Sequence, residues 1–180
     1  MIYVFLDDGF EECEAISPID VLRRAGFDVK TVGVGAKTVT GSHGIPVVCD
    51  ICEDEAVFED VEAVVLPGGM PGTLNLEKSA TVQKFIDFAA ENNLVLGAIC
   101  AAPSILGHKG LLKNKNATCF TGFEKDLIQA QVVDLPVVID GNIVTAYGAG
   151  AALNFGFALL EVLRGKEVAE NMKKQMRFIG

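Results

Sequence analysis

A cysteine stands where a predicted strand passes into a predicted helix. The segment LVLGAICAAP (residues 94–103) begins as a short apolar run and surrounds Cys100 with the small residues Ala98, Ala101 and Ala102. This is the layout of a nucleophile elbow, with cysteine in place of serine. A thiol at a helix N-terminus faces free N–H groups, which favour its thiolate. Cys100 is therefore the candidate nucleophile, and the alternative is a thiol that merely packs.

A glycine-rich loop, LPGGMPG (residues 66–72), follows another predicted strand and should lie at the same edge of the sheet. Glycines let main-chain N–H groups approach a ligand closely, and two such groups form an oxyanion hole. We expect the N–H groups of Gly69 and Ala101 to take this role. A plain Pro-Gly turn is the alternative.

An acidic cluster, DDGFEECEA (residues 7–15), follows the first predicted strand. In open α/β sheets, ligands bind beyond the carboxyl ends of the strands, so this cluster and Cys100 are expected to meet. Two adjacent negative charges raise each other's pKa, and a single shared proton resolves the conflict: the carboxyl group stays protonated and donates a hydrogen bond to the thiolate sulfur. The pattern alone does not separate Glu11, Glu12 and Glu14, and a solvated acidic surface is the alternative reading.

Other potential reactive groups are few. The chain has two histidines, His43 and His108, and we expect His108 to point away from Cys100 because it lies about two helical turns further along. Cys49 and Cys52 form a lone C-x-x-C that ends a strand-like run, without the further ligands that zinc needs. We therefore expect ordinary thiols there, no metal and no cofactor.

Composition restricts the class of protein. The net charge of −9 disfavours binding of nucleic acid through its phosphate backbone. The apolar runs are too short for a membrane span, the N-terminus lacks the features of a signal peptide, and the cysteine count of five is odd. These features predict free thiols and a cytoplasmic protein.

Strand-like and helix-like segments alternate along the whole chain, which predicts one domain over residues 1–180. We expect an α/β fold with a doubly wound, mostly parallel sheet between helices. In the first helix, Ser17 is the expected N-cap and Pro18 the first helical residue. The other expected helices cover 81–92, a segment after Pro103, 148–163 and 166–177. The expected strands cover 2–6, 27–34, 63–66, 94–99, 136–139 and 143–145, with an edge hairpin within 37–48.

Several motifs together resemble the ThiJ/PfpI superfamily, in the branch of the human Parkinson-disease-associated protein deglycase and its bacterial relatives. They occur in order along almost the whole chain: DGFEECEA, SPIDVLRRAGF, VVLPGG, AICAAP and YGAGAALNFGFALLEVLRGKEVA. The resemblance implies a flavodoxin-like fold, similar to that of class I glutamine amidotransferases, and a homodimer. It also implies that Cys100 is the nucleophile, that Glu14 hydrogen-bonds it, and that Gly69 and Ala101 are main-chain donors.

The resemblance further implies activity on methylglyoxal and glyoxal, as a cofactor-free glyoxalase or as a deglycase of early glycation adducts. Relatives are also described as oxidative-stress sensors and as chaperones, and both remain rival hypotheses. Peptidase activity is disfavoured because Ala101 stands where the protease-like branch has histidine.

Some positions differ from the pattern of the family. Phe120 replaces a frequent histidine, Tyr147 replaces a frequent arginine, and His43 stands where the partner subunit often supplies another arginine. Together with Gly68, these three residues are the expected lining of the pocket.

Overall fold

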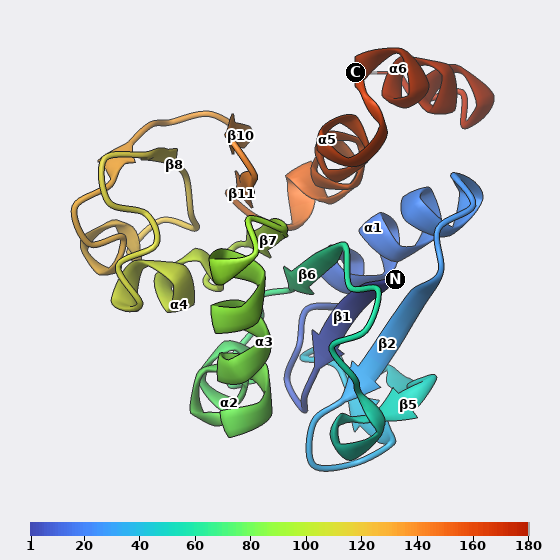
Figure 1. Cartoon of the computed structure of the whole chain (residues 1–180), viewed down its shortest axis with the longest axis vertical. Coiled ribbons are helices and arrows are strands. Elements are labelled where there is room, and N and C mark those ends of the chain that lie inside the picture. Colours follow the sequence, from blue (N-terminus) through green and yellow to red (C-terminus); the bar gives the residue numbers. More distant parts are fainter. Residues whose placement is uncertain (180) are drawn as a thin grey trace.

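Seven strands form the central sheet of the computed structural model, which describes residues 1–179 (Figure 1). Their order is β10-β11-β7-β6-β1-β2-β5, and each pair of neighbours is parallel except the edge hairpin β10–β11. The five strands β2-β1-β6-β7-β11 reproduce the flavodoxin-like order, as expected. The bounds are β1 Ile2–Leu6, β2 Val29–Gly33, β5 Ile51–Cys52, β6 Ala63–Leu66, β7 Val95–Ile99, β10 Val137–Asp140 and β11 Ile143–Ala146.

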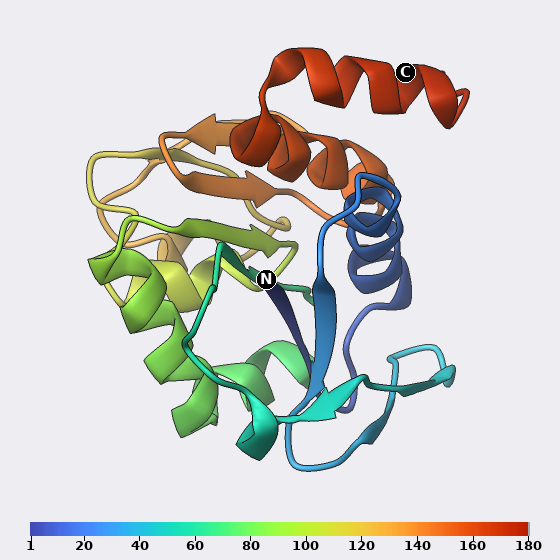
Figure 2. The ribbon, with the colours of Figure 1, turned by 45° about the vertical axis from the view of Figure 1, so that its right-hand side comes forward.

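Helices cover both faces of this sheet (Figures 1 and 2). One face carries α1 (Glu12–Arg24) and α5 (Ala152–Arg164), and α6 (Lys166–Gln175) packs on α5. The other face carries α2 (Gly72–Lys78), α3 (Ala80–Glu91) and α4 (Pro103–His108). Two small sheets lie outside the main one. The first pairs β3 (Thr38–Thr40) with β4 (Pro46–Val48), and the second pairs β8 (Asn116–Ala117) with β9 (Gln131–Val132).

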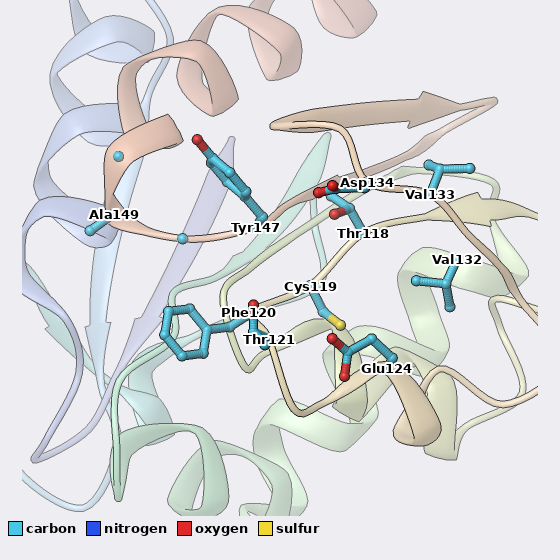
Figure 3. A pocket seen from close by; sticks show the side chains of 12 residues that line it. Thr118, Cys119, Phe120, Thr121, Glu124, Val132, Val133, Asp134, Tyr147 and Ala149 are labelled. Carbon is cyan, nitrogen blue, oxygen red and sulfur yellow. The ribbon is translucent and has the colours of Figure 1, made fainter.

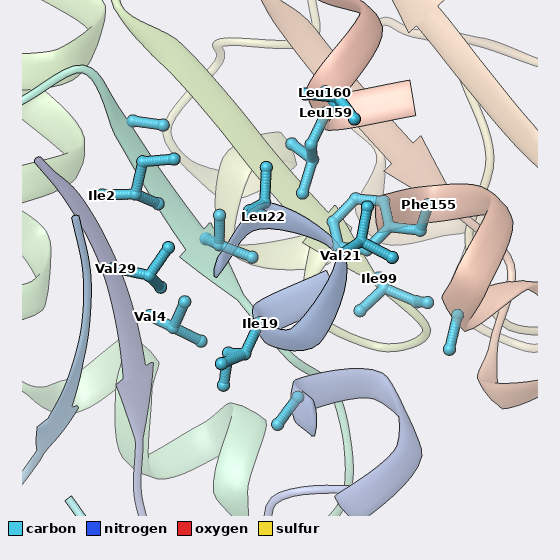
Figure 4. Close-up of a cluster of buried hydrophobic side chains, with 14 of the residues drawn as sticks. Ile2, Val4, Ile19, Val21, Leu22, Val29, Ile99, Phe155, Leu159 and Leu160 are labelled. Carbon is cyan, nitrogen blue, oxygen red and sulfur yellow. The ribbon is translucent and has the colours of Figure 1, made fainter. Parts of the chain in front are cut away.

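The hydrophobic core has two halves, one on each face of the sheet. In β1, Ile2, Val4 and Leu6 point toward α1 and α5, whereas Tyr3 and Phe5 point to the opposite face. Figure 4 shows the first half, where side chains of the sheet meet those of α1 and α5. Because successive side chains of a strand alternate between faces, a strand buried on both sides must be apolar throughout. The core therefore holds the ends of β1, β6 and β7 in fixed positions.

The start of α1 differs from the expectation that Ser17 caps it. The helix begins at Glu12, because the side chain of Glu11 accepts a hydrogen bond from the N–H of Glu14 at 2.7 Å and acts as the N-cap. Pro18 consequently lies inside the helix. It packs on α5 at Gly156, where an added Cβ would come within 3.0 Å of the Cα of Pro18. The three glutamates of the acidic cluster thus lie at the N-cap and in the first turn of α1.

Most other expected elements are present with small shifts in their bounds. The expected helix over 148–163 is divided into a short 3-10 helix, Ala149–Ala151, and α5. Helix α2 and the strands β8 and β9 were not expected, because their segments are short and without clear periodicity. Among the described residues, no helix combines the length and apolar character that crossing a membrane requires.

Candidate active site

Cys100 follows β7 in a backbone conformation that is unusual for a residue with a side chain. Its φ is 65°, its N–H donates to the carbonyl of Ala146 at 2.9 Å, and its carbonyl accepts from the N–H of Phe120 at 2.8 Å. Such a left-handed residue costs about 1–3 kcal/mol and persists where the surroundings hold it. The expected elbow is therefore present, and its side chain is half-buried rather than sealed in the core.

The carboxyl group of Glu14 reaches Cys100 from the first turn of α1. Glu14 is 1% exposed, and its Oε2 accepts from the N–H of Gly68 at 3.0 Å. The side chain of Cys100 and the main chain of Ala149 also lie close to this carboxyl group and favour its charged form. Burial raises the pKa of Glu14 to about 7, and the charge of Glu11 adds to this, while the hydrogen bonds act in the opposite direction. Glu14 is thus suited to exchanging protons near neutral pH.

The neighbouring glutamates have other positions. Glu11 caps α1, and the buried Glu12 accepts hydrogen bonds from the N–H groups of His43 and Ile45 at 2.8 and 3.4 Å. Burial alone would raise the pKa of Glu12, but these bonds and the side chain of His43 lower it to about 2. The structure therefore brings Glu14, and neither of its acidic neighbours, to Cys100.

Two main-chain N–H groups contact the sulfur of Cys100, those of Gly69 and Ala101. Gly69 has a φ of 91°, and an added Cβ would lie 2.4 Å from the main-chain nitrogen of Glu11. Only glycine fits this position without displacing the start of α1. The two expected donors thus lie at the thiol, one from the glycine-rich loop and one from the elbow.

The elbow favours a thiolate, but burial and the adjacent carboxyl group oppose it. Burial raises the pKa of Cys100 to about 12, and the charge and hydrogen bond of Glu14 add to this, while the donors Gly69 and Ala101 act in the opposite direction. Helix α4 gives little help, because it begins only at Pro103 and has 6 residues. A negative charge on either group disfavours ionisation of the other, so the Cys100 thiol and the Glu14 carboxyl group hold one proton between them. Transfer of that proton from sulfur to Glu14 produces the reactive thiolate.

A cavity of about 680 Å³ lies near this pair, although neither Cys100 nor Glu14 is among its lining residues. Phe120 and Tyr147 line it as expected, together with Gly148 and Ala149 (Figure 3). The last two also lie at Glu14: a Cβ on Gly148 would lie 3.9 Å from its Oε1, and the main chain of Ala149 hydrogen-bonds its carboxyl group. Gly148 and Ala149 therefore connect the wall of the cavity to the reactive pair.

Two expected pocket residues do not line this cavity. Gly68 lies behind the reactive pair, where an added Cβ would be 2.6 Å from both the Cβ of Cys100 and the Oε2 of Glu14. His43 is 69% exposed, and its Nδ1 lies 2.9 Å from Glu12, because the β3–β4 loop folds back onto the start of α1. The absence of a side chain at Gly68 thus leaves room for Cys100 and Glu14. His43 binds the β3–β4 loop to the start of α1.

The remaining reactive side chains lie elsewhere. His108 pairs with Glu77 and Asp126, in agreement with the expectation that it points away from Cys100. Cys49 and Cys52 are free thiols. Potential ligand atoms of Glu11, Glu12 and His43 lie within 4.8 Å of one another, but the hydrogen bonds of Glu12 already account for this group.

Sequence reasoning missed much of the far wall of the cavity. Thr118, Cys119, Glu124 and Asp134 line it and come from the irregular segments around β8 and β9. These segments have no clear period, and the only signal is a group of polar residues between short apolar runs.

Comparisons with known proteins agree with this geometry. Residues 1–162 match the model of the DJ-1/PfpI family. Protein dj-1beta of Drosophila melanogaster is 33% identical over 174 residues, which cover 95% of this chain and 93% of that protein. Protein DJ-1 homolog B of Arabidopsis thaliana is 35% identical over 175 residues and 96% of this chain, but the match spans only 40% of that longer protein.

Solved structures share the fold as well. Oxidized DJ-1 of Toxoplasma gondii superposes with a TM-score of 0.94 at 30% identity, over 99% of this chain and 98% of that one. The match of the family model, the relative of similar length and this superposition all cover most of the chain. The chain therefore belongs to the DJ-1/PfpI family.

Proposed function

We propose that this protein is a cofactor-free enzyme of glyoxalase or deglycase type that uses Cys100 on α-oxoaldehydes or their early glycation adducts. The close approach of the Glu14 carboxyl group to the Cys100 side chain carries the proposal. It pairs a nucleophile with a proton acceptor whose pKa is about 7. Membership of the DJ-1/PfpI family supports a role in the response to carbonyl or oxidative stress.

In the proposed reaction, Glu14 accepts the proton of the Cys100 thiol as sulfur attacks the aldehyde carbon of methylglyoxal. Glu14 returns this proton to the carbonyl oxygen, which becomes the hydroxyl of a hemithioacetal. The N–H groups of Gly69 and Ala101 would stabilise negative charge at the reacting atoms. Glu14 then moves the proton of the first carbon to the second through an enediol. The product is a lactoyl thioester, which water hydrolyses to lactate and free Cys100.

The direct test measures methylglyoxal consumption and lactate formation by the wild-type protein and by Cys100→Ser. Loss of turnover in Cys100→Ser is expected, since the alcohol is a far weaker nucleophile than the thiolate. Cys52→Ser is the matched control, because Cys52 is a free, half-buried thiol in β5, which β2, β1 and β6 separate from β7. Full activity of Cys100→Ser would contradict the proposal.

A second candidate function is that of an oxidation sensor. The half-buried Cys100 and the oxidized state of the similar Toxoplasma gondii DJ-1 favour it. Its thiolate would attack a peroxide oxygen, release hydroxide and become a sulfenic acid, and a second peroxide would give the sulfinate. Mass spectrometry after mild peroxide treatment tests this: the function requires oxygen to be gained at Cys100 before Cys13, and equal gain at both would contradict it.

We also propose that the protein acts as a homodimer. Apolar side chains are exposed on α1 and the β3–β4 hairpin, where Ile16, Ile45 and Val48 are 44%, 56% and 70% exposed. A second copy would cover them. Light scattering should give the mass of a dimer for the wild type and of a monomer for Val48→Glu, and a monomeric wild type would contradict the proposal.

A further inference from the structure

The cavity beside the reactive pair is acidic. Its far wall carries the carboxyl groups of Glu124 and Asp134, together with the hydroxyl groups of Thr118, Thr121 and Tyr147. Among its lining residues, all within the described part of the chain, there is no lysine, arginine or histidine. Lys125 follows Glu124 directly but does not line the cavity. The cavity therefore presents negative charge without a compensating cation.

The carboxyl groups belong to separate segments that converge on the cavity. Figure 3 shows Glu124 beside the thiol of Cys119 and Asp134 beside Thr118. One oxygen of Glu124 accepts a hydrogen bond from the N–H of Gly122 at 2.8 Å, which holds this side chain on the wall. The other oxygen has lone pairs left for a ligand.

Two aromatic rings, those of Phe120 and Tyr147, also line the cavity. Phe120 and Tyr147 are 51% and 40% exposed, which is a high exposure for rings of this size. The faces of aromatic rings attract cations, most strongly where water is partly excluded. Aromatic rings and carboxyl groups therefore favour the same kind of ligand, one with a positive charge.

The size of the cavity also bears on the ligand. A volume of about 680 Å³ lies within the range of sites for drug-sized ligands and far exceeds what a three-carbon oxoaldehyde fills. A substrate that uses the whole cavity must have a larger remainder attached to its reacting carbonyl group. The net charge of the chain, −9, further disfavours an anionic remainder.

We infer that this cavity selects carbonyl compounds whose remainder carries a positive charge, and that Glu124 and Asp134 set the preference. The inference takes its reaction from the proposed function, but it assigns a charge class to the substrate and two specificity residues outside the reactive pair. Compounds with an ammonium or guanidinium group are accepted, and matched compounds with a carboxylate or sulfonate are disfavoured.

A pair of thiol reagents tests this charge preference without requiring turnover. The 2-(trimethylammonio)ethyl and 2-sulfonatoethyl methanethiosulfonates deliver a cation and an anion through the same reacting group. The rate of labelling is measured separately at Cys100 and Cys13 by peptide mass spectrometry. In Glu124→Gln/Asp134→Asn, the cation-to-anion rate ratio at Cys100 should fall about tenfold, because two nearby charges are removed. The ratio at Cys13 should stay constant.

The control variant Glu91→Gln/Glu167→Gln removes the same net charge from positions that do not line the cavity. Its ratio at Cys100 should match that of the wild type. Salt provides a measurement without any variant: the wild-type ratio at Cys100 should fall several-fold between about 0.02 M and about 0.5 M NaCl, because salt screens exposed charges.

The outcomes separate this inference from the proposed function. The charge preference is overturned if the cation-to-anion rate ratio at Cys100 is the same in the wild type and in Glu124→Gln/Asp134→Asn. It is also overturned if the control variant lowers this ratio by the same factor. Either result counts even if methylglyoxal is converted to lactate. A tenfold loss confined to the cavity variant supports the preference, even if lactate is never formed and the proposed reaction fails.

Discussion

The carboxyl group of Glu14, in the first turn of α1, lies beside the side chain of Cys100 at the end of β7, and a Cβ added at Gly68 would be 2.6 Å from both the Glu14 Oε2 and the Cys100 Cβ. The strand order places β1 next to β6 and β6 next to β7, so the loop after β1 leads α1 across the glycine-rich loop toward the elbow. Burial makes the two acidic groups dependent on each other, because neither ionises easily while the other is charged. The fold thereby builds a proton-sharing pair from two distant parts of the chain.

Stability should fall as the pH rises past the ordinary pKa of a glutamate. The pKa of Glu14 is raised from 4.5 to about 7, so between these values the folded protein binds more protons than the unfolded chain. This loss amounts to ~3 kcal/mol across the window. Glu14→Gln cannot ionise and should lose most of this pH dependence. Urea unfolding of both proteins at about pH 4.5 and about pH 8 measures it.

Glu12 does not confuse this measurement, since its pKa of about 2 keeps it ionised throughout the window. An equally steep decline in Glu14→Gln would show that another group is responsible.

Gly68→Ala should remove activity while leaving most of the fold intact. The added Cβ would lie 2.6 Å from both the Cys100 Cβ and the Glu14 Oε2, so the reactive pair must separate. We expect a loss of at least ~100-fold in kcat/KM, the scale of a misplaced catalytic group.

Gly26→Ala is the control for stability alone. Gly26 has a positive φ of 82°, but an added Cβ there meets nothing within 4 Å. This variant should lower the Tm and retain activity. Normal turnover in Gly68→Ala, with the Tm of both variants recorded, would show that the close contact is unimportant.

Glu12→Ala should destabilise the protein more than His43→Ala does. Removal of the carboxylate leaves the N–H groups of His43 and Ile45 without their acceptor, whereas removal of the imidazole retains both main-chain bonds. Loss of buried hydrogen bonds of this kind costs about 1–3 kcal/mol. Denaturant unfolding at neutral pH gives both values, and equal costs would mean that the carboxylate has no anchoring role.

Much of this site could be predicted because its parts follow buried strands. The apolar runs before Cys100 and before the glycine-rich loop predicted parallel strands, and parallel strands bring their carboxyl ends to one edge. The choice of Glu14 needed more than the pattern, because three glutamates stand within 4 positions of one another. The family resemblance supplied that choice, and the cap at Glu11 explains it by setting where α1 begins.

Other features could not be predicted from local pattern. Proline favours the first position of a helix, which predicts a helix that begins at Pro18. In the structure, Pro18 lies inside α1, where the packing of α1 on α5 tolerates it. The elbow and a shared proton predict a thiolate at Cys100, but only the folded chain shows that burial beside Glu14 acts against the main-chain donors. Glu124 and Asp134 lie in irregular segments, where only the folded chain shows which side chains face a cavity.

The most direct test of the central claim, that Cys100 and Glu14 act as one unit, is a double-mutant cycle on lactate formation from methylglyoxal. The four proteins are the wild type, Cys100→Ser, Glu14→Gln and the double variant. Groups that act together give non-additive losses, so the double variant should be no slower than Cys100→Ser alone. Additive losses, or a Glu14→Gln protein with wild-type turnover, would contradict the account.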